Sequence, residues 1–181
     1  MDNFTYELKI PKSRIAIIIG KEGNIKKDLE EATKTELKID SKEGDVFIKG
    51  DDALGLYIAR EIIRAIARGF NPELAKLLLK QDYIFETIQL PDYAGKSKDT
   101  LIRLKGRVIG KEGKSRMIIE QLTETNISVF GKTVSIIGNS ENVTSARRAI
   151  ETLLRGATHS SVYTWLEKKR KQLKRKEIME L

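Results

Sequence analysis

The sequence has 181 residues, which suffice for one large domain or two small ones, and its 40% hydrophobic and 33% charged residues are typical of a folded chain that does not span a membrane. The absence of cysteine and the single histidine, His159, exclude disulfides, thiolate chemistry and multi-histidine metal sites, so we expect no cofactor. With no signal-peptide pattern, we expect a cytoplasmic protein. The net charge of +8 favours a polyanionic partner.

The first seventy residues predict an ordered series of strands and helices. Residues 4–10 alternate apolar and polar side chains and end at a proline, as half-buried strands do. A short helix then leads into GKEG at 20–23, and the next helix begins at the second glycine. Strands at 36–39 and 46–49 form a hairpin. Asp51 can cap a long helix whose apolar stripe is Leu54, Ile58, Ile62 and Ala65.

The remaining chain repeats this series. Residues 71–81 begin with Asn-Pro and predict a helical linker. Residues 107–129 then align with 17–39 at a constant offset of 90, which falls to 88 where Gly138 matches Gly50 and Ile150 matches Ile62. The second copy predicts strands at 83–90, 126–129 and 134–137, and a long helix that Ser140 can cap, with the stripe Val143, Ala146, Ile150 and Leu153. About ten extra residues, 92–101, precede its GKEG loop.

The repeat predicts an α+β protein with two tandem domains. The order of strand, helix, GxxG, helix, strand, strand and helix resembles the type I KH module, an RNA-binding domain with a three-stranded antiparallel sheet and three helices. We expect the first domain at 1–70, the linker at 71–81 and the second domain at 82–158. A basic C-terminal helix follows at 159–181, in which Tyr163, Trp165 and Leu166 can dock while every face beyond Leu173 is polar.

The glycines of each loop allow a sharp turn, so that backbone amides and the positive end of the next helix can approach phosphates. The lysine of each loop adds a charge, whereas the glutamate is expected to face solvent. In the second copy the candidate RNA-binding residues are Gly110, Lys111, Glu112, Gly113, Lys114, Arg103, Lys105, Arg107 and Arg116, with Ile109, Ile118 and Val129 as apolar walls for bases. In the first copy they are Gly20, Lys21, Glu22, Gly23, Lys26 and Arg14.

Charge ranks the two copies. Residues 103–116 hold six cations and one anion, a net +5, whereas residues 13–26 hold three cations and one anion, a net +2. We therefore expect the second copy to be the stronger RNA site, with the first copy either assisting it or contacting a protein. The tail adds seven cations that can contact phosphates without choosing a sequence: Lys168, Lys169, Arg170, Lys171, Lys174, Arg175 and Lys176.

A narrower resemblance rests on IRLKGRVIGKEGKSRMIIEQLT, ISVFGKTVSIIG and LLRGATHSSVYTWLE. These runs are similar to the archaeal form of the small-subunit ribosome assembly factors known as partner of Nob, related to the Krr proteins. The resemblance implies binding of single-stranded small-subunit rRNA near its 3′ end and help in its maturation. The implied partners are a Nob-type endonuclease and other small-subunit assembly or initiation proteins.

The resemblance further implies a protein that has no catalytic activity of its own, and we expect a monomer without membrane contact. Abundant Lys and Glu without Cys are typical of hyperthermophile proteins. Other functions stay open. The chain could be a KH protein of transcription or messenger-RNA regulation, a nuclease, or a protein scaffold. A hydrolysis assay with and without Mg²⁺ distinguishes a nuclease from a binding protein, and salt-insensitive function would favour the scaffold.

Overall fold

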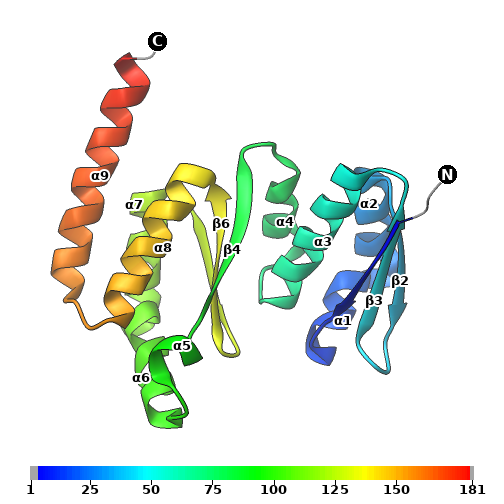
Figure 1. Ribbon diagram of the computed structural model, residues 1–181, viewed down its shortest axis with the longest axis horizontal. Helices are drawn as coiled ribbons and strands as arrows, with labels where there is room; N and C mark the ends of the chain where they lie inside the picture. The colour runs from blue at the N-terminus through cyan, green and yellow to red at the C-terminus, as the bar shows by residue number, and fades with distance from the viewer. Residues whose placement is uncertain (1–3, 180–181) are drawn as a thin grey trace. The chain divides into compact units, whose positions relative to one another are not determined.

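The computed structural model describes residues 4–179 and divides into two compact units, whose boundary falls between Tyr83 and Ile84, at the start of the fourth strand. Each unit has one three-stranded antiparallel sheet with its helices on one face (Figure 1). The strand orders are β1-β3-β2 and β4-β6-β5, so the third strand of each copy is central. The predicted α+β architecture with two repeated sheets is therefore confirmed.

The first unit contains β1 (Phe4–Lys9), α1 (Lys12–Ile19), η1 (Lys21–Gly23), α2 (Asn24–Thr33), β2 (Glu36–Asp40), β3 (Asp45–Gly50), α3 (Ala53–Ala67), α4 (Pro72–Ala75) and η2 (Lys76–Leu79). The second contains β4 (Tyr83–Gln89), α5 (Pro91–Ala94), α6 (Lys98–Ile109), η3 (Lys111–Gly113), α7 (Lys114–Thr123), β5 (Asn126–Phe130), β6 (Thr133–Asn139), α8 (Ser140–Leu154) and α9 (His159–Met179). The extra residues of the second copy form α5 and lengthen α6 at its start.

The core of each unit lies between the sheet and its helices. In the first unit Leu37 of β2 faces Ile48 of the central strand, and both are buried. In the second unit Ile127 and Ile136 form the corresponding pair. Because side chains alternate along a strand, every second residue of the central strand enters the core. Among residues 4–179, no helix is both long and apolar enough to cross a membrane.

The repeat extends to individual hydrogen bonds around two threonines in each copy. Thr33 Oγ1 donates to the carbonyl of Leu29 at 2.6 Å and lies 2.8 Å from the Thr35 hydroxyl. Thr123 and Thr125 make the same contacts at the same distances. Glu30 and Glu120 each accept a hydrogen bond of 2.7 Å from the strand that follows, at Leu37 N and Ile127 N. These contacts fix the helix that follows each loop to the hairpin.

The long helices require a correction of the alignment and of one predicted stripe. Their N-caps are Asp52 and Asn139, not Asp51 and Ser140, so the offset between α3 and α8 is 87. The Asp52 side chain accepts from Gly55 N, which turns Leu54 outward, and Leu54 is 65% exposed. The core positions of α3 are Leu56, Ala59, Ile62, Ile63 and Ile66. The stripe predicted for α8 is confirmed as buried.

Segments that follow each long helix pack back on their own unit. The linker forms α4, with Asn71 as its N-cap, and then η2, and both contact α3. In the second unit α9 begins at His159 and packs against α7 and α8 (Figure 1). Val162 and Leu166 are its buried anchors, whereas Trp165 is half-buried with Arg148 over its ring at 5.0 Å. The basic helix is thus a docked part of the second unit.

Candidate nucleic-acid interface

The two GKEG loops have the same backbone conformation. The first glycine of each has φ 74° and ψ near 175°, at Gly20 (178°) and Gly110 (173°). The second glycines, Gly23 and Gly113, lie in the left-handed region with φ 77° and 76° and are the N-caps of α2 and α7. The helix after each loop therefore begins where the sequence predicts, and its N-terminal end lies beside the loop.

The first glycine is required by packing as well as by its dihedral angles. A Cβ on Gly110 would lie 2.6 Å from the Ser115 backbone nitrogen, and one on Gly20 would lie 2.2 Å from Asn24 Oδ1. A Cβ on Gly113 would meet nothing within 4 Å, so only the positive φ at this position favours glycine. The helix that follows each loop therefore packs closely against the first glycine.

Two of the predicted RNA-binding arginines donate hydrogen bonds that hold the fold. Arg14 donates to the carbonyls of Ile66 at 2.8 Å and Phe70 at 2.7 Å, at the end of α3. Arg107 donates to Leu153 O at 3.1 Å and to Ala157 O, at the end of α8. Ile66 and Leu153 lie in the last turns of α3 and α8, where the regular helical hydrogen bonds end, and Phe70 and Ala157 lie just beyond these helices. Partial burial lowers the pKa of Arg14, and the charge it holds serves the fold.

Two further cations form ion pairs within their own helices. Lys26 lies 3.8 Å from Glu30, and Arg116 lies 3.8 Å from Glu120. Both glutamates also accept from the strands, so each pair belongs to the repeated link between helix and hairpin. A phosphate could still approach Lys26 or Arg116, but it would compete with a carboxylate.

The other cations among the predicted loop residues belong mainly to the second loop. Lys111, Lys114 and Arg103 are exposed, and Lys105 is half-buried. The first loop retains the exposed Lys21, and Asn24 stands where the second copy has a lysine. The Asn24 side chain accepts from Ile25 N at 2.8 Å, which occupies one amide at the start of α2. Glu22 and Glu112 are exposed, as expected of carboxylates beside a phosphate site.

The predicted base-contacting side chains are half-buried and lie outside the fully buried core. Ile109, Ile118 and Val129 come from α6, α7 and β5, respectively. In the first copy the position of Ile118 is Asp28, whose carboxylate lies 3.1 Å from Lys76 Nζ. A charged pair is a poor wall for a base. Sequence alignment of the copies could have identified this difference.

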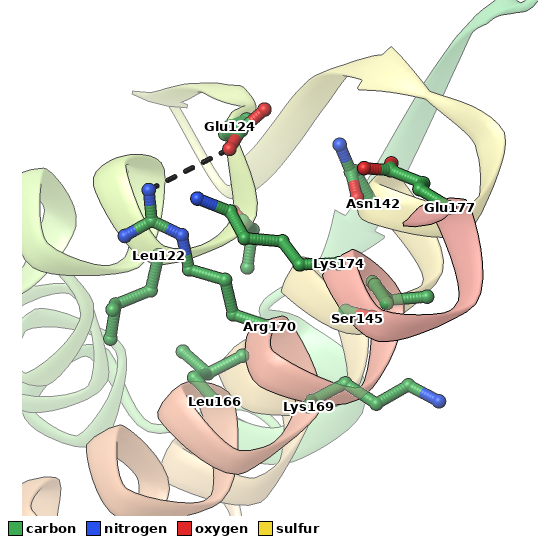
Figure 2. Close-up of a pocket in the computed structure, with 11 residues that line it drawn as sticks. Leu122, Glu124, Asn142, Ser145, Leu166, Lys169, Arg170, Lys174 and Glu177 are labelled. Atoms are coloured by element: carbon green, nitrogen blue, oxygen red, sulfur yellow. Dashed lines mark ion pairs between the residues drawn. The ribbon is translucent and has the colours of Figure 1, made fainter. Parts of the chain in front are cut away.

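The tail cations divide into two groups. Lys169, Arg170 and Lys174 line a small pocket of about 60 Å³ between α9 and the ends of α7 and α8 (Figure 2). Arg170 and Lys174 point toward Glu124, which lies 3.7 Å from Arg170, whereas Lys169 points away (Figure 2). Lys176 lies 3.6 Å from Glu141 of α8. The other predicted contacts, Lys168, Lys171 and Arg175, are exposed.

Two polar groups near the second loop are not among the predicted site residues. The Ser115 hydroxyl is buried behind Gly110 and has no hydrogen-bond partner among residues 4–179. Its small size, where the first copy has Ile25, was the available signal. His159 Nε2 donates to the carbonyl of Arg107 at 2.8 Å, which joins the start of α9 to α6. The histidine therefore has a structural role.

Comparison with known proteins identifies the family. Residues 5–65 match a KH domain model, and residues 84–171 match the model of the second KH domain of PNO1, described as a eukaryotic type KH-domain (KH-domain type I). The KH domain-containing protein MJ0443 of Methanocaldococcus jannaschii is 51% identical over 172 residues, which cover 93% of this chain and 75% of that protein. The chain belongs to the PNO1/Dim2 family of proteins with two KH domains.

Two other PNO1/Dim2 family members extend the comparison. The crystal structure of an a/eIF2alpha-aDim2p-rRNA complex from Pyrococcus horikoshii OT3 matches with a TM-score of 0.88 and 44% identity, over 94% of this chain and 96% of that chain. The pre-rRNA-processing protein PNO1 of Chaetomium thermophilum is 34% identical over 110 residues, which cover 60% of this chain and 42% of that protein. This chain therefore spans under half the length of the fungal relative that it matches.

Proposed function

We propose that this PNO1/Dim2-family protein binds single-stranded RNA chiefly through its second KH domain, and that the RNA is small-subunit pre-rRNA near its 3′ end. The observation that carries the proposal is the second GKEG loop. It combines a glycine turn, the start of α7 and the exposed cations Arg103, Lys111 and Lys114 beside half-buried apolar walls. KH domains clamp the backbone of about four nucleotides with such a loop.

The loop and its walls divide the work of binding. Glycines without Cβ atoms let the phosphates approach the amides and the positive end of α7 closely. Lys111 and Lys114 then neutralise phosphate charge. Ile109, Ile118 and Val129 offer apolar surfaces to unstacked bases, which only a single strand can present. The first domain has the same turn with fewer cations, so its contribution to RNA binding is the smaller one.

The identity of the RNA and of the partners is supported by the relatives. The Pyrococcus protein was crystallised with rRNA and an initiation factor subunit, and the fungal protein is named for pre-rRNA processing. In this proposal the protein holds the RNA as an assembly factor and catalyses no reaction. Maturation of the 3′ end belongs to a Nob-type endonuclease partner. Crosslinking in native cells, followed by mapping of the sites, tests this assignment, and crosslinks confined to messenger RNA would contradict it.

A paired loop experiment tests the RNA site. Lys111→Asp with Glu112→Asp places two carboxylates in the second loop while both glycines remain. We expect a large loss of affinity for single-stranded RNA, because phosphate would meet negative charge. The matched control is Lys21→Asp with Glu22→Asp in the first loop, for which we expect the smaller loss. Fluorescence anisotropy measures the affinities, and melting curves should show unchanged folding. A larger loss from the first-loop pair would reverse the ranking of the domains.

A further inference from the structure

The ten extra residues of the second copy form a groove that has no role in the GKEG loop. It lies where α5 and the start of α6 meet the turn between β5 and β6, and its volume is about 580 Å³. The hydrogen bond from Leu90 N to Lys132 O, 2.9 Å, holds the segment to this turn. A volume of this size falls within the range of ligand sites, about 300 to 1,000 Å³.

The lining of the groove combines an apolar floor with positive charge. Pro91, Leu101 and Ile102 supply apolar surface, and Ile102 is 68% exposed. Three exposed lysines surround it, namely Lys96, Lys98 and Lys132. The acidic residues of the segment, Asp92 and Asp99, are not part of the lining. Apolar surface framed by cations fits a base and its phosphates, whereas it would repel a basic partner.

A strip of helix surface leads from this groove to the GKEG loop. Ile102, Gly106 and Ile109 follow one another at spacings of four and three residues on α6, so they share one side of the helix, and Gly110 comes next. The distance along the helix from Ile102 to Gly110 is about 12 Å at 1.5 Å per residue. The groove and the loop are therefore close enough to contact one RNA strand.

Gly106 is an independent indication of close approach. A glycine in the middle of a helix costs stability relative to alanine. A Cβ at Gly106 would meet nothing within 4 Å, so the packing of the protein does not require the glycine, and its position on the strip is exposed. The corresponding residue of the first copy is Ala16, on α1. A bare backbone on this side of α6 allows a ligand to lie flat against the helix.

We propose that the α5 groove and the exposed strip of α6 extend the RNA path of the second domain beyond the nucleotides clamped by the GKEG loop. An unstacked base contacts the apolar floor, and the three lysines contact the neighbouring phosphates. This inference rests on the proposed function, because it assigns a longer single-stranded footprint to the same domain.

The test compares labelled single-stranded RNA pools of random sequence, 5 and 10 nucleotides long, on the full-length protein. One variant is Lys96→Gln, Lys98→Gln and Lys132→Gln, and another is Gly106→Gln, with Ala16→Gln as the matched control in the first copy. The wild type should bind the 10-mer more tightly than the 5-mer. Both groove variants should lose most of this length gain while their affinity for the 5-mer is kept.

Two further readouts separate binding from folding. The triple variant should lower the slope of log affinity against log salt for the 10-mer by about 2, at about 0.7 per phosphate contact. Gly106→Gln should melt at the same temperature as the wild type or higher, because glutamine favours helix over glycine. Groove variants that keep the length gain would overturn this proposal alone. A Lys111/Glu112 pair that leaves 5-mer binding unchanged would contradict the proposed function itself.

Discussion

Arg103 and Arg107 lie four residues apart on α6 and have different surroundings. Arg103 is exposed, whereas Arg107 donates to two carbonyls at the end of α8. The main chain of Arg107 also accepts from His159, so this residue links α6, α8 and α9. Arg14 has the same capping function in the first unit, from a different turn of α1. Part of the positive charge near the loops therefore serves folding, and we propose that the exposed part serves RNA binding.

Substitution of these two arginines should separate the functions. Arg107→Ala should lower the free energy of unfolding by about 1 to 3 kcal/mol, because two partly buried carbonyls lose a charged donor. Arg103→Ala should change it by less than about 0.5 kcal/mol, as exposed substitutions do. Denaturant unfolding measures the stabilities, and RNA titration of the folded proteins should show the larger loss for Arg103→Ala. Equal stabilities for both variants would contradict the capping role.

Among the elements, the short strands and the starts of the loop-following helices could be predicted from the sequence, because their signals are local. Alternation predicts β1, and the second glycine predicts the starts of α2 and α7. The apolar stripe predicted for α3 was wrong at Leu54. Asp51 and Asp52 are equally good N-caps by residue type, and the one that caps the helix decides which side chains face the core. The carbonyl partners of Arg107 lie 46 and 50 residues away and could not be predicted from local pattern.

The C-terminal helix has a docked part and an exposed part. Leu166 is buried and Leu173 is half-buried, whereas most side chains beyond Leu173 are exposed. The ion pairs Arg170–Glu124 and Lys176–Glu141 join its cations to α7 and α8. Exposed pairs contribute little to stability, about 0 to 1 kcal/mol each. These cations can therefore exchange carboxylates for phosphates at small cost to the fold.

Two truncations of α9 should differ in stability but not in the kind of binding lost. Removal of residues 174–181 should leave melting unchanged, and removal of 168–181 should lower the free energy of unfolding by about 1 kcal/mol, because Leu173 and Arg170 are lost. Each truncation should lower the affinity for all RNAs by a similar factor. The ratio of affinities for a preferred and a scrambled RNA decides the matter. If truncation removes the preference for one RNA over the other, the tail contacts bases or orders the RNA-binding surface of the second domain.

At the scale of the whole molecule, RNA binding should be electrostatic and selective for single strands. The slope of log affinity against log salt should be about −0.7 per contacted phosphate on a single strand. A duplex of equal length should bind more weakly, because paired bases cannot lie against the apolar side chains beside the loop. Titration of single-stranded and duplex RNA at several salt concentrations measures both effects. Tighter binding of the duplex would exclude the apolar side chains beside the loop as the contact for unpaired bases.

The duplicated threonine and glutamate hydrogen bonds have a consequence for the evolution of the molecule. Contacts that recur at equal distances in both copies hold the same framework in each, whatever each copy binds. We expect the positions at which the copies differ on that framework to account for their different RNA affinities. Asn24 against Lys114, Asp28 against Ile118 and Ala16 against Gly106 are such positions. Each copy thus serves as a control for the other. Exchange of the residues at these three pairs of positions should weaken RNA binding by the second copy and strengthen it in the first.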